Sequence, residues 1–309
     1  MFGSVWAPLG GKVADRWATL LLSPVLAFWG GGLLAWVWSH GGFGGAASGW
    51  TALERQWRQA FATATPVAEV ALIVVALLVV AASARLVESL TLPALRVLEG
   101  YWPPWAGPLR TALVRARGRR IDRDAERWRA LAVRQAELSP AERSRYARLD
   151  ARRAAVPPLP GDRMPTRLGD LLRAAERRPR QRYGLETVVC WPRLWLVLPE
   201  QARADVGAVR ARVDEAARLW VVGLAFAVWV FLTWWALVVA LAVMMVAYRM
   251  LLSAAADYTV LLQSCFDLHR KILYEELGVA WETREEPGDG ERVTAFLARG
   301  AALDGGREA

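Results

Sequence analysis

The sequence VALIVVALLVVAASA, residues 70–84, decides the class of fold, because it contains fifteen consecutive residues without a charged side chain. Thr65 and Pro66 just before it are typical of a helix start, and Arg85 closes the run. A helix of about 20 apolar residues crosses the hydrocarbon core of a bilayer, which is roughly 30 Å thick. Residues 67–85 therefore predict a membrane-spanning helix.

A second apolar run covers residues 17–38 and contains no ionisable side chain. Lys12 and Arg16 precede it, and a glycine-rich stretch follows it. A cleaved signal peptide is the alternative interpretation, but its apolar region is shorter, about 7–15 residues. The length of the run and its four tryptophans favour a retained span.

The third apolar run, residues 219–248, allows two interpretations. As one helix of about 30 residues it would be roughly 45 Å long, which requires a steep tilt in the membrane. Two spans fit if the chain turns at Thr233 and Trp234, between arms at residues 216–232 and 235–256. Adjacent tryptophans suit a membrane interface, so two spans are the preferred interpretation.

Arginine placement predicts the orientation of the spans. Residues 87–215 contain 26 arginines against 16 acidic residues, a net charge of +10, whereas Arg55 and Arg58 are the only basic residues between the first two spans. Basic loops stay on the cytoplasmic side of a bacterial plasma membrane. The N-terminus, the central basic region and, with four spans, the C-terminus are therefore expected in the cytoplasm.

These patterns predict an all-α, polytopic membrane protein of about four spans with a cytoplasmic helical domain. The expected regions are an N-terminal transmembrane hairpin (residues 1–86, with spans at about 17–38 and 67–85), a basic helical domain (87–215), a second transmembrane hairpin (216–256), and an amphipathic helix with an acidic, flexible tail (257–309).

Small residues repeat every four positions within the expected spans. Such stripes let helices approach closely in lipid, and a conduction path is the alternative interpretation. The repeating residues are Ser23, Ala27, Gly31 and Ala35 in the first span, Gly223 with Ala227 in the third, and Ala236 with Ala240 in the fourth.

The first part of the basic domain has the features of a membrane surface. Tyr101, Trp102 and Trp105 lie in a stretch, residues 86–108, that matches the aromatic belt of membrane proteins. The alternative interpretation of this stretch is a helix stop without a partner. Residues 109–155 follow as two charged helices broken at Ser139 and Pro140, with 14 arginines against 6 acidic residues.

Two interpretations of this charge remain open: a surface for anionic lipid headgroups, and a solvated helical pair without a ligand. The arginines expected to contact lipid are Arg117, Arg119, Arg120 and Arg123. Nucleic acid is not expected as a partner, because Trp128 and Tyr146 alone offer rings for stacking in this stretch.

The rest of the basic domain predicts further short elements. Thr166 is placed to cap a helix, and another helix is expected to begin at Glu200. Residues 188–198 are too short to span, so they either dip into the membrane interface or pack as a buried strand or turn. Beyond the last span, Leu261, Cys265, Leu268 and Ile272 form a seam that is either an internal packing face or a contact between copies of the chain.

Three motifs carry a resemblance to a known family: PTRLGDLLRAAE at residues 165–176, RYGLETVVCWPRLW at 182–195 and FDLHRKILYEEL at 266–277. With the N-terminal spans, they resemble an uncharacterised multi-pass membrane protein family of actinobacteria. The likeness extends over most of the chain. It implies no activity, because that family has none assigned.

Catalytic and metal sites find little support in the sequence. His40 and His269 are the only histidines and are expected on opposite sides of the membrane. Cys190 and Cys265 are far apart and are expected as reduced thiols, and Gly10-Gly11-Lys12 lacks the preceding glycine of a phosphate loop. No catalytic, cofactor-binding or metal-binding residue is therefore predicted, and no cofactor is expected.

These observations favour a non-enzymatic membrane anchor or scaffold whose cytoplasmic domain contacts anionic lipid and a protein partner. Two alternatives stay open. One is a channel or transport subunit, with pore-forming defence effectors among the candidates. The other is a membrane-embedded enzyme acting on lipid, for which Asp170 or Glu186 would supply the carboxylate.

Overall fold

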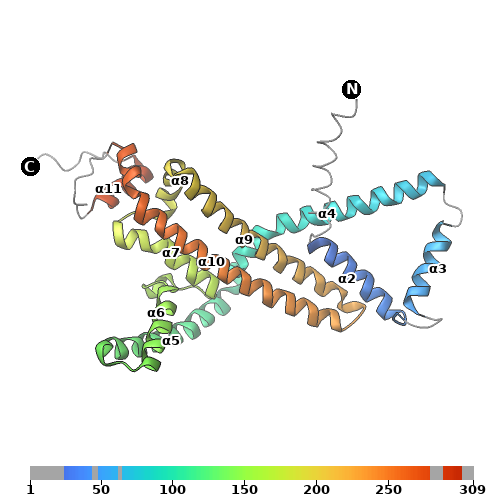
Figure 1. Ribbon diagram of the computed structural model, residues 1–309, viewed down its shortest axis with the longest axis horizontal. Coiled ribbons are helices and arrows are strands. Elements are labelled where there is room, and N and C mark those ends of the chain that lie inside the picture. The colour runs from blue at the N-terminus through green and yellow to red at the C-terminus, as the bar shows by residue number, and fades with distance from the viewer. Residues whose placement is uncertain (1–23, 44–47, 62–64, 279–287, 301–309) are drawn as a thin grey trace, which may run out of the picture. The chain divides into compact units, whose positions relative to one another are not determined.

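The computed structural model describes residues 24–43, 48–61, 65–278 and 288–300. All secondary structure in these ranges is helical, which confirms the all-α class there, and the chain divides into two compact units (Figure 1). Unit 1 comprises Met1–Ala94 and Asp214–Arg249, and unit 2 comprises Leu95–Val213 and Met250–Ala309.

Unit 1 holds the apolar helices. Two of them, α9 and α10, are separated at residues 232–234, where the sequence placed a turn, so the third apolar run is not one continuous helix. The elements are α2 (Pro24–Ser39), α3 (Gly49–Phe61), α4 (Pro66–Glu99) as far as Ala94, the end of α9 (Glu200–Phe226), the 3-10 helix η4 (Ala227–Phe231) and the start of α10 (Trp235–Glu276).

Two helices of the described chain are long and apolar enough to cross a membrane: the one that begins at Pro66, and α10. About four spans were predicted, so the other two remain predictions. One of them, residues 17–38, is described only from Pro24 onward. Its beginning, with Ser23, Lys12 and Arg16, lies outside the described residues.

The helix at the second predicted span is longer than the sequence indicated. Arg85 was expected to close it, whereas α4 continues through Pro93 to Glu99. Arg85 forms an ion pair with Glu88 at 3.1 Å. Residues three apart in sequence are neighbours on one helical face, so Arg85 lies within the helix and not at its end. Much of the expected interfacial stretch 86–108 is therefore helix.

Small residues, valines and aromatic rings form the interior of unit 1. Ala236 and Ala240 are buried against Phe226, with Phe28 and Trp229 packed beside them. A Cβ added at Gly31 would lie 2.3 Å from Phe226 Cε2. Close approach of helices through small residues is typical of packing in lipid.

Unit 2 surrounds a leucine-rich core. Leu185, Leu194 and Phe266 are fully buried there, and Val206 and Leu273 nearly so. Its elements are η1 (Pro104–Ala106), α5 (Gly107–Ala132), η2 (Gln135–Glu137), α6 (Pro140–Ala154), η3 (Pro160–Asp162), α7 (Arg167–Tyr183), α8 (Thr187–Val197), the beginning of α9, the end of α10 and α11 (Asp289–Arg299).

Helices α5 and α6 form a hairpin, as the break at Ser139 and Pro140 predicted. Ser139 caps α6: its Oγ accepts the backbone N–H of Glu142, and the Glu142 carboxylate accepts the N–H of Ser139 at 2.9 Å. This reciprocal capping box is a strong local signal for a helix start. A small core of Leu131, Leu138 and Leu149 holds the two helices together.

The caps and faces of the neighbouring helices also follow the sequence. Thr166 caps α7 by accepting the N–H of Gly169 at 3.0 Å. Helix α9 begins at Glu200, as expected, and buries Val206 and Val209 on one face.

Three expectations for unit 2 are corrected. Residues 188–198 form most of a helix, α8, rather than a strand or turn, because Cys190 and Leu194 face the core one turn apart. Leu268, which was expected in the seam of α10, is exposed, whereas Cys265 of that seam is buried and Leu261 packs against the same core as Phe266. The tail was expected to be flexible, whereas residues 289–299 form α11, which buries Val293.

Candidate functional site

The surface between α5 and α6 gathers arginine side chains. A groove of about 380 Å³ is lined by four arginines and one acidic residue, Asp124. Arg127 and Arg152 approach that carboxylate at 3.7 and 3.4 Å. The groove, called the arginine groove below, is lined by Asp124, Arg127, Arg145, Arg148, Leu149 and Arg152.

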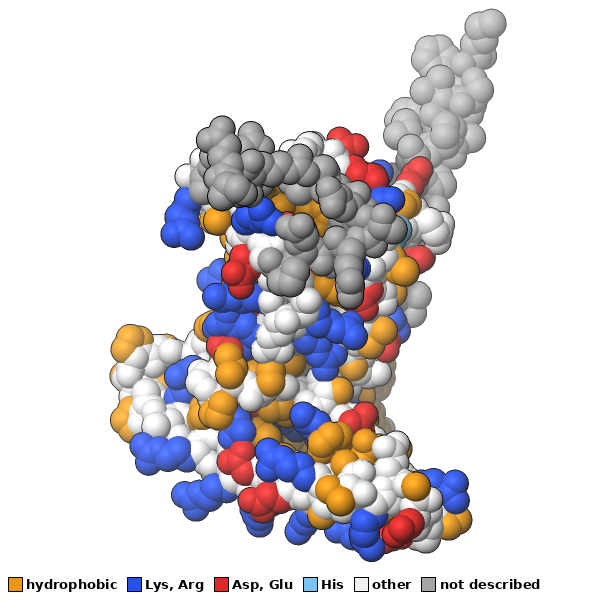
Figure 2. All heavy atoms as spheres, turned by 90° about the vertical axis from the view of Figure 1, so that its left-hand side faces the viewer, with side chains coloured by type: hydrophobic (Ala, Val, Ile, Leu, Met, Phe, Trp, Pro, Cys, Tyr) orange, Lys and Arg blue, Asp and Glu red, His pale blue; other side chains and the backbone are white. Residues whose placement is uncertain are grey.

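The charge of the arginine groove is not balanced within the described chain. Arg145 and Arg148 are exposed and make no ion pair with any described residue, and Asp124 is the groove's only carboxylate there. Basic side chains also follow the hairpin surface at the lower edge of Figure 2. Four guanidinium groups around one carboxylate suit an anion such as a phosphate, which guanidinium binds in a bidentate manner.

The four arginines expected to contact lipid do not share one environment. Arg119, Arg120 and Arg123 are exposed on α5, and none forms an ion pair with a described residue. Arg117 instead pairs with Asp170, a carboxylate that is 1% exposed. Arg117 therefore holds α5 against α7, so its charge is already matched inside unit 2.

The aromatic residues expected at a membrane surface lie at the start of this region. Trp105 is 82% exposed and Tyr101 is also exposed, whereas Trp102 is half-buried. The Trp102 indole N–H donates to the carbonyl oxygen of Val97 at 2.8 Å, which fixes that ring against the end of α4. Trp105 is thus the ring most available to an external partner.

A second hollow, called the Glu99 cavity below, opens where the end of α4 meets α7, α8 and α9 within unit 2. Its volume is about 240 Å³. Two carboxylates, Glu99 and Glu176, and two guanidinium groups, Arg173 and Arg210, line it together with apolar side chains. Its polar groups therefore carry equal numbers of opposite charges.

Glu99 is the distinctive group of this cavity. Its backbone carbonyl accepts the Thr166 hydroxyl at 3.0 Å, but its carboxylate forms no ion pair or hydrogen bond with a described residue. Burial, and then the nearby charge of Glu176, raise the pKa of this carboxyl, against the opposing effect of Arg210. An acidic group that is partly desolvated and lacks a partner is common at binding sites.

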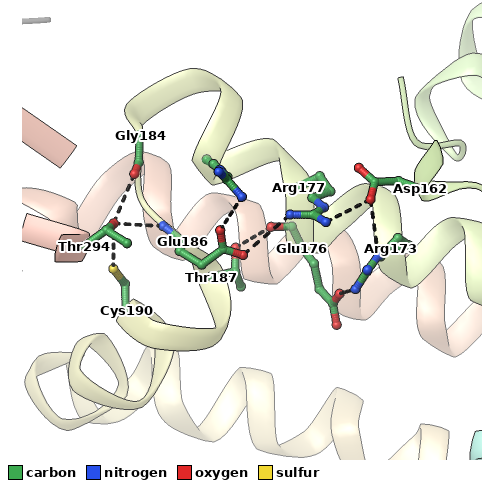
Figure 3. Close-up of polar contacts among 10 residues, drawn as sticks. Asp162, Arg173, Glu176, Arg177, Gly184, Glu186, Thr187, Cys190 and Thr294 are labelled. Carbon is green, nitrogen blue, oxygen red and sulfur yellow. Dashed lines mark hydrogen bonds and ion pairs between the residues drawn. The ribbon is translucent and has the colours of Figure 1, made fainter. Parts of the chain in front are cut away.

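Charged groups of η3 and α7 beside the Glu99 cavity pair with one another (Figure 3). Arg173 contacts Glu176 at 3.2 Å and Asp162 at 3.9 Å. Arg177 donates to Asp162 at 2.8 Å. Glu176 also accepts the Thr187 hydroxyl through its backbone carbonyl, at 2.7 Å, which ties α7 to the start of α8. This network holds the wall of the cavity in place.

A side chain of α11 forms hydrogen bonds with the backbone at the start of α8 (Figure 3). The Thr294 hydroxyl donates to the carbonyl oxygen of Gly184 at 3.0 Å and accepts the backbone N–H of Glu186 at 3.1 Å. The residue before α8, Glu186, provides no side-chain cap of its own. A side chain from about 100 residues downstream thus satisfies an N–H group at the helix start.

The carboxylates considered for catalysis have structural roles here. Asp170 accepts the backbone N–H of Met164 at 2.7 Å in addition to its pairing with Arg117. Glu186 pairs with Arg180 at 2.9 Å. Within the described residues, no three His, Cys, Asp or Glu side chains lie close enough together to hold a metal ion.

Both cysteines are buried, and burial raises the pKa of each thiol. Cys190 also lies 3.8 Å from the Thr294 hydroxyl, a contact that favours ionisation but does not offset burial. A raised pKa leaves little reactive thiolate at neutral pH.

The small residues that repeat every four positions, and that were expected to let helices pack closely, lie in unit 1. Ala35, Gly223, Ala236 and Ala240 are buried, Gly31 and Ala227 are half-buried, and Ala27 is exposed. Ser23 lies outside the described residues. Gly32, which the four-residue spacing did not include, contacts the ring of Trp229 closely.

Comparison with protein-family models, curated proteins and solved structures found no match. The resemblance carried by the three sequence motifs therefore stays a prediction. The structural features that bear on function are the arginine groove, the Glu99 cavity and the apolar helices.

Proposed function

We propose that this chain is a non-enzymatic integral membrane protein of about four spans, anchored in a bacterial plasma membrane with its N-terminus and unit 2 in the cytoplasm. In this proposal, unit 2 binds anionic lipid headgroups and holds a protein partner at the membrane. The apolar helices support the membrane anchor, and the arginine groove supports the lipid contact.

Exposure of the apolar helices supports insertion into lipid. In the most apolar window of the helix that begins at Pro66, no residue is buried, and in that of α10 only 22% are. The core helix of a soluble protein would bury such a window, because exposing it to water is unfavourable. Exposing these apolar side chains has a lower free-energy cost in lipid than in water.

The arginine groove is the observation that carries the lipid contact. Arg145 and Arg148 project from one face of α6, three residues apart, beside Arg127 and Arg152. Each basic residue near an anionic membrane contributes about 1 kcal/mol of binding, so two contribute about 2 kcal/mol.

Exposed Val188, Leu196 and Leu268 on α8 and α10 provide apolar surface for the protein partner.

The test uses the full chain in detergent, titrated with phosphatidylglycerol or phosphatidylcholine, with retained lipid measured by native mass spectrometry. The double variant Arg145→Gln/Arg148→Gln should bind phosphatidylglycerol about 30-fold more weakly, from the loss of two such contributions. A matched control, Arg203→Gln/Arg299→Gln, removes the same charge from exposed positions outside the hairpin. If the two double variants retain equal amounts of phosphatidylglycerol, the arginine groove is not the lipid site.

A further inference from the structure

The Glu99 cavity contains groups suited to a ligand with two opposite charges. Its carboxylates and guanidinium groups come from the end of α4, from α7 and from α9, three separate helices of one unit. The guanidinium of Arg173 is already paired with Glu176. The carboxylate of Glu99 forms no ion pair or hydrogen bond with a described residue and interacts only at longer range with Arg210 and Arg96. A cation bound at Glu99 would give this carboxylate the direct ion pair that it lacks among the described residues.

The cation that fits is organic rather than metallic. Metal ions such as Ca²⁺ require six or more oxygen ligands, and the cavity offers two carboxylates. It does offer three aromatic rings, those of Tyr101, Trp191 and Tyr258. Aromatic faces attract ammonium groups, most strongly where water is partly excluded. An alkylammonium group therefore matches the lining better than a metal ion does.

A phosphate group matches the other side of the lining. Arg210 lies on α9 and Arg173 on α7, and both reach the same cavity. Guanidinium groups bind phosphate oxygens through charge-assisted hydrogen bonds. Apolar residues, including Leu172 and Val188, complete the wall and suit the short carbon chain between the two charges.

We propose that the Glu99 cavity binds an aminoalkyl phosphate, with its ammonium group at Glu99 and its phosphate at Arg210. The phosphoethanolamine group has this chemistry. It occurs in the headgroup of phosphatidylethanolamine and in soluble glycerophosphoethanolamine. Binding of the lipid form rests on the proposed membrane location, whereas binding of the soluble form does not.

The first experiment titrates glycerophosphoethanolamine into the detergent-solubilised full chain and follows binding by calorimetry. Binding should saturate below about 1 mM. Glycerophosphoglycerol, which has a phosphate but no ammonium group, is the matched ligand and should bind at least 10-fold more weakly. Equal binding of the two ligands would overturn the proposal, because the ammonium group would then contribute nothing.

The decisive variant is Glu99→Gln, which keeps the side-chain shape and the backbone carbonyl that accepts Thr166. Loss of the charge should weaken glycerophosphoethanolamine binding about 10-fold or more. Tyr101→Leu, at an exposed ring, should weaken it about threefold. Glu276→Gln removes an exposed carboxylate of α10 outside the cavity and should leave binding unchanged. Unchanged binding in Glu99→Gln would overturn the assignment of this residue.

The pH dependence of glycerophosphoethanolamine binding provides an independent test. The carboxyl of Glu99 faces Glu176 on α7, Arg210 on α9 and Arg96 on its own helix, and its pKa is raised. The carboxyl must be ionised to hold an ammonium group, so binding should weaken as the pH falls through this raised pKa. The loss should therefore begin at a higher pH than for an ordinary glutamate, and Glu99→Gln should abolish that step.

The second experiment separates the lipid from the soluble source. The full chain is exchanged into micelles with equal phosphatidylethanolamine and phosphatidylglycerol, and retained lipid is identified by native mass spectrometry. Retention of phosphatidylethanolamine that is lost in Glu99→Gln identifies the lipid as the ligand. Binding of glycerophosphoethanolamine without such retention identifies a soluble ligand. Absence of both would overturn the proposal, whatever the arginine groove does with phosphatidylglycerol.

Discussion

The two units of the chain are stabilised by opposite kinds of contact. In the described part of unit 1, the interior combines glycine, alanine and valine with aromatic rings, and two ion pairs, Arg58 with Glu54 and Arg85 with Glu88, lie on exposed helix faces. Unit 2 has a leucine core, and arginine–carboxylate pairs such as Arg117 with Asp170 join its helices.

This difference matches the solvent that the proposed membrane location gives each unit. In lipid, apolar burial gives no driving force between helices, so close packing of small residues must hold them together. In water, apolar burial provides most of the stability, and charged side chains can remain at the surface. We therefore expect the stability of unit 2 to depend on its ion pairs, and the stability of unit 1 to depend on close steric packing of its helices.

The largest expected effect is the removal of Arg117 from unit 2. Arg117→Met leaves the buried Asp170 without its ionic partner, which destabilises a protein by about 3–5 kcal/mol. Thermal unfolding of the detergent-solubilised chain, followed by circular dichroism, measures the change. Arg119→Met is the control, since Arg119 is exposed and forms no ion pair with described residues, and it should change stability by less than about 0.5 kcal/mol.

If Arg117→Met and Arg119→Met unfold alike, matched charge is not what stabilises unit 2. The result also decides how the lipid contact is tested. Arg117 must be left unchanged in any lipid-binding variant, because its loss would act through Asp170 rather than through lipid.

A smaller effect is expected from a single methyl group in unit 1. A Cβ at Gly49, the first residue of α3, would lie 2.0 Å from the carbonyl oxygen of Val37 in α2. Gly49→Ala must push the two helices apart, and overpacking of this kind costs about 1–3 kcal/mol. The thermal unfolding measurement described above detects it.

Gly30 provides the matched control within α2. Nothing lies within 4 Å of a Cβ built there, so Gly30→Ala adds the same methyl group without a clash. Alanine favours helix over glycine by up to about 1 kcal/mol, so this variant should be slightly more stable. Equal stabilisation by Gly49→Ala would show that unit 1 does not depend on a close fit.

Much of the fold could be predicted because its signals are local. Uninterrupted apolar runs fixed the position of α4, and the sequence from Ser139 to Glu142 contains a complete capping box. The continuation of α4 past Arg85 could not be predicted, because an arginine and a proline there are weak signals against surrounding residues that favour helix.

The sites were harder to predict because their partners are distant in sequence. Arg117 and Asp170 are 53 residues apart, and nothing in the sequence of α5 distinguishes Arg117 from Arg119. Helix α11 lies in an acidic, glycine-rich stretch, where one buried apolar side chain, Val293, gives little signal. The charged groups of the Glu99 cavity come from three helices that are distant in sequence, and no spacing pattern in the sequence predicts that they meet.

The membrane topology is the central claim, and cysteine labelling in intact cells tests it most directly. Cys190 and Cys265 are buried, so they should react slowly, and exposed positions should be used instead. Gln56→Cys in α3 and Ser144→Cys in α6 are both at exposed positions. A membrane-impermeant maleimide added outside should label Gln56→Cys at once and Ser144→Cys only after lysis. Labelling of Ser144→Cys in intact cells, or protection of Gln56→Cys, would contradict the proposed orientation.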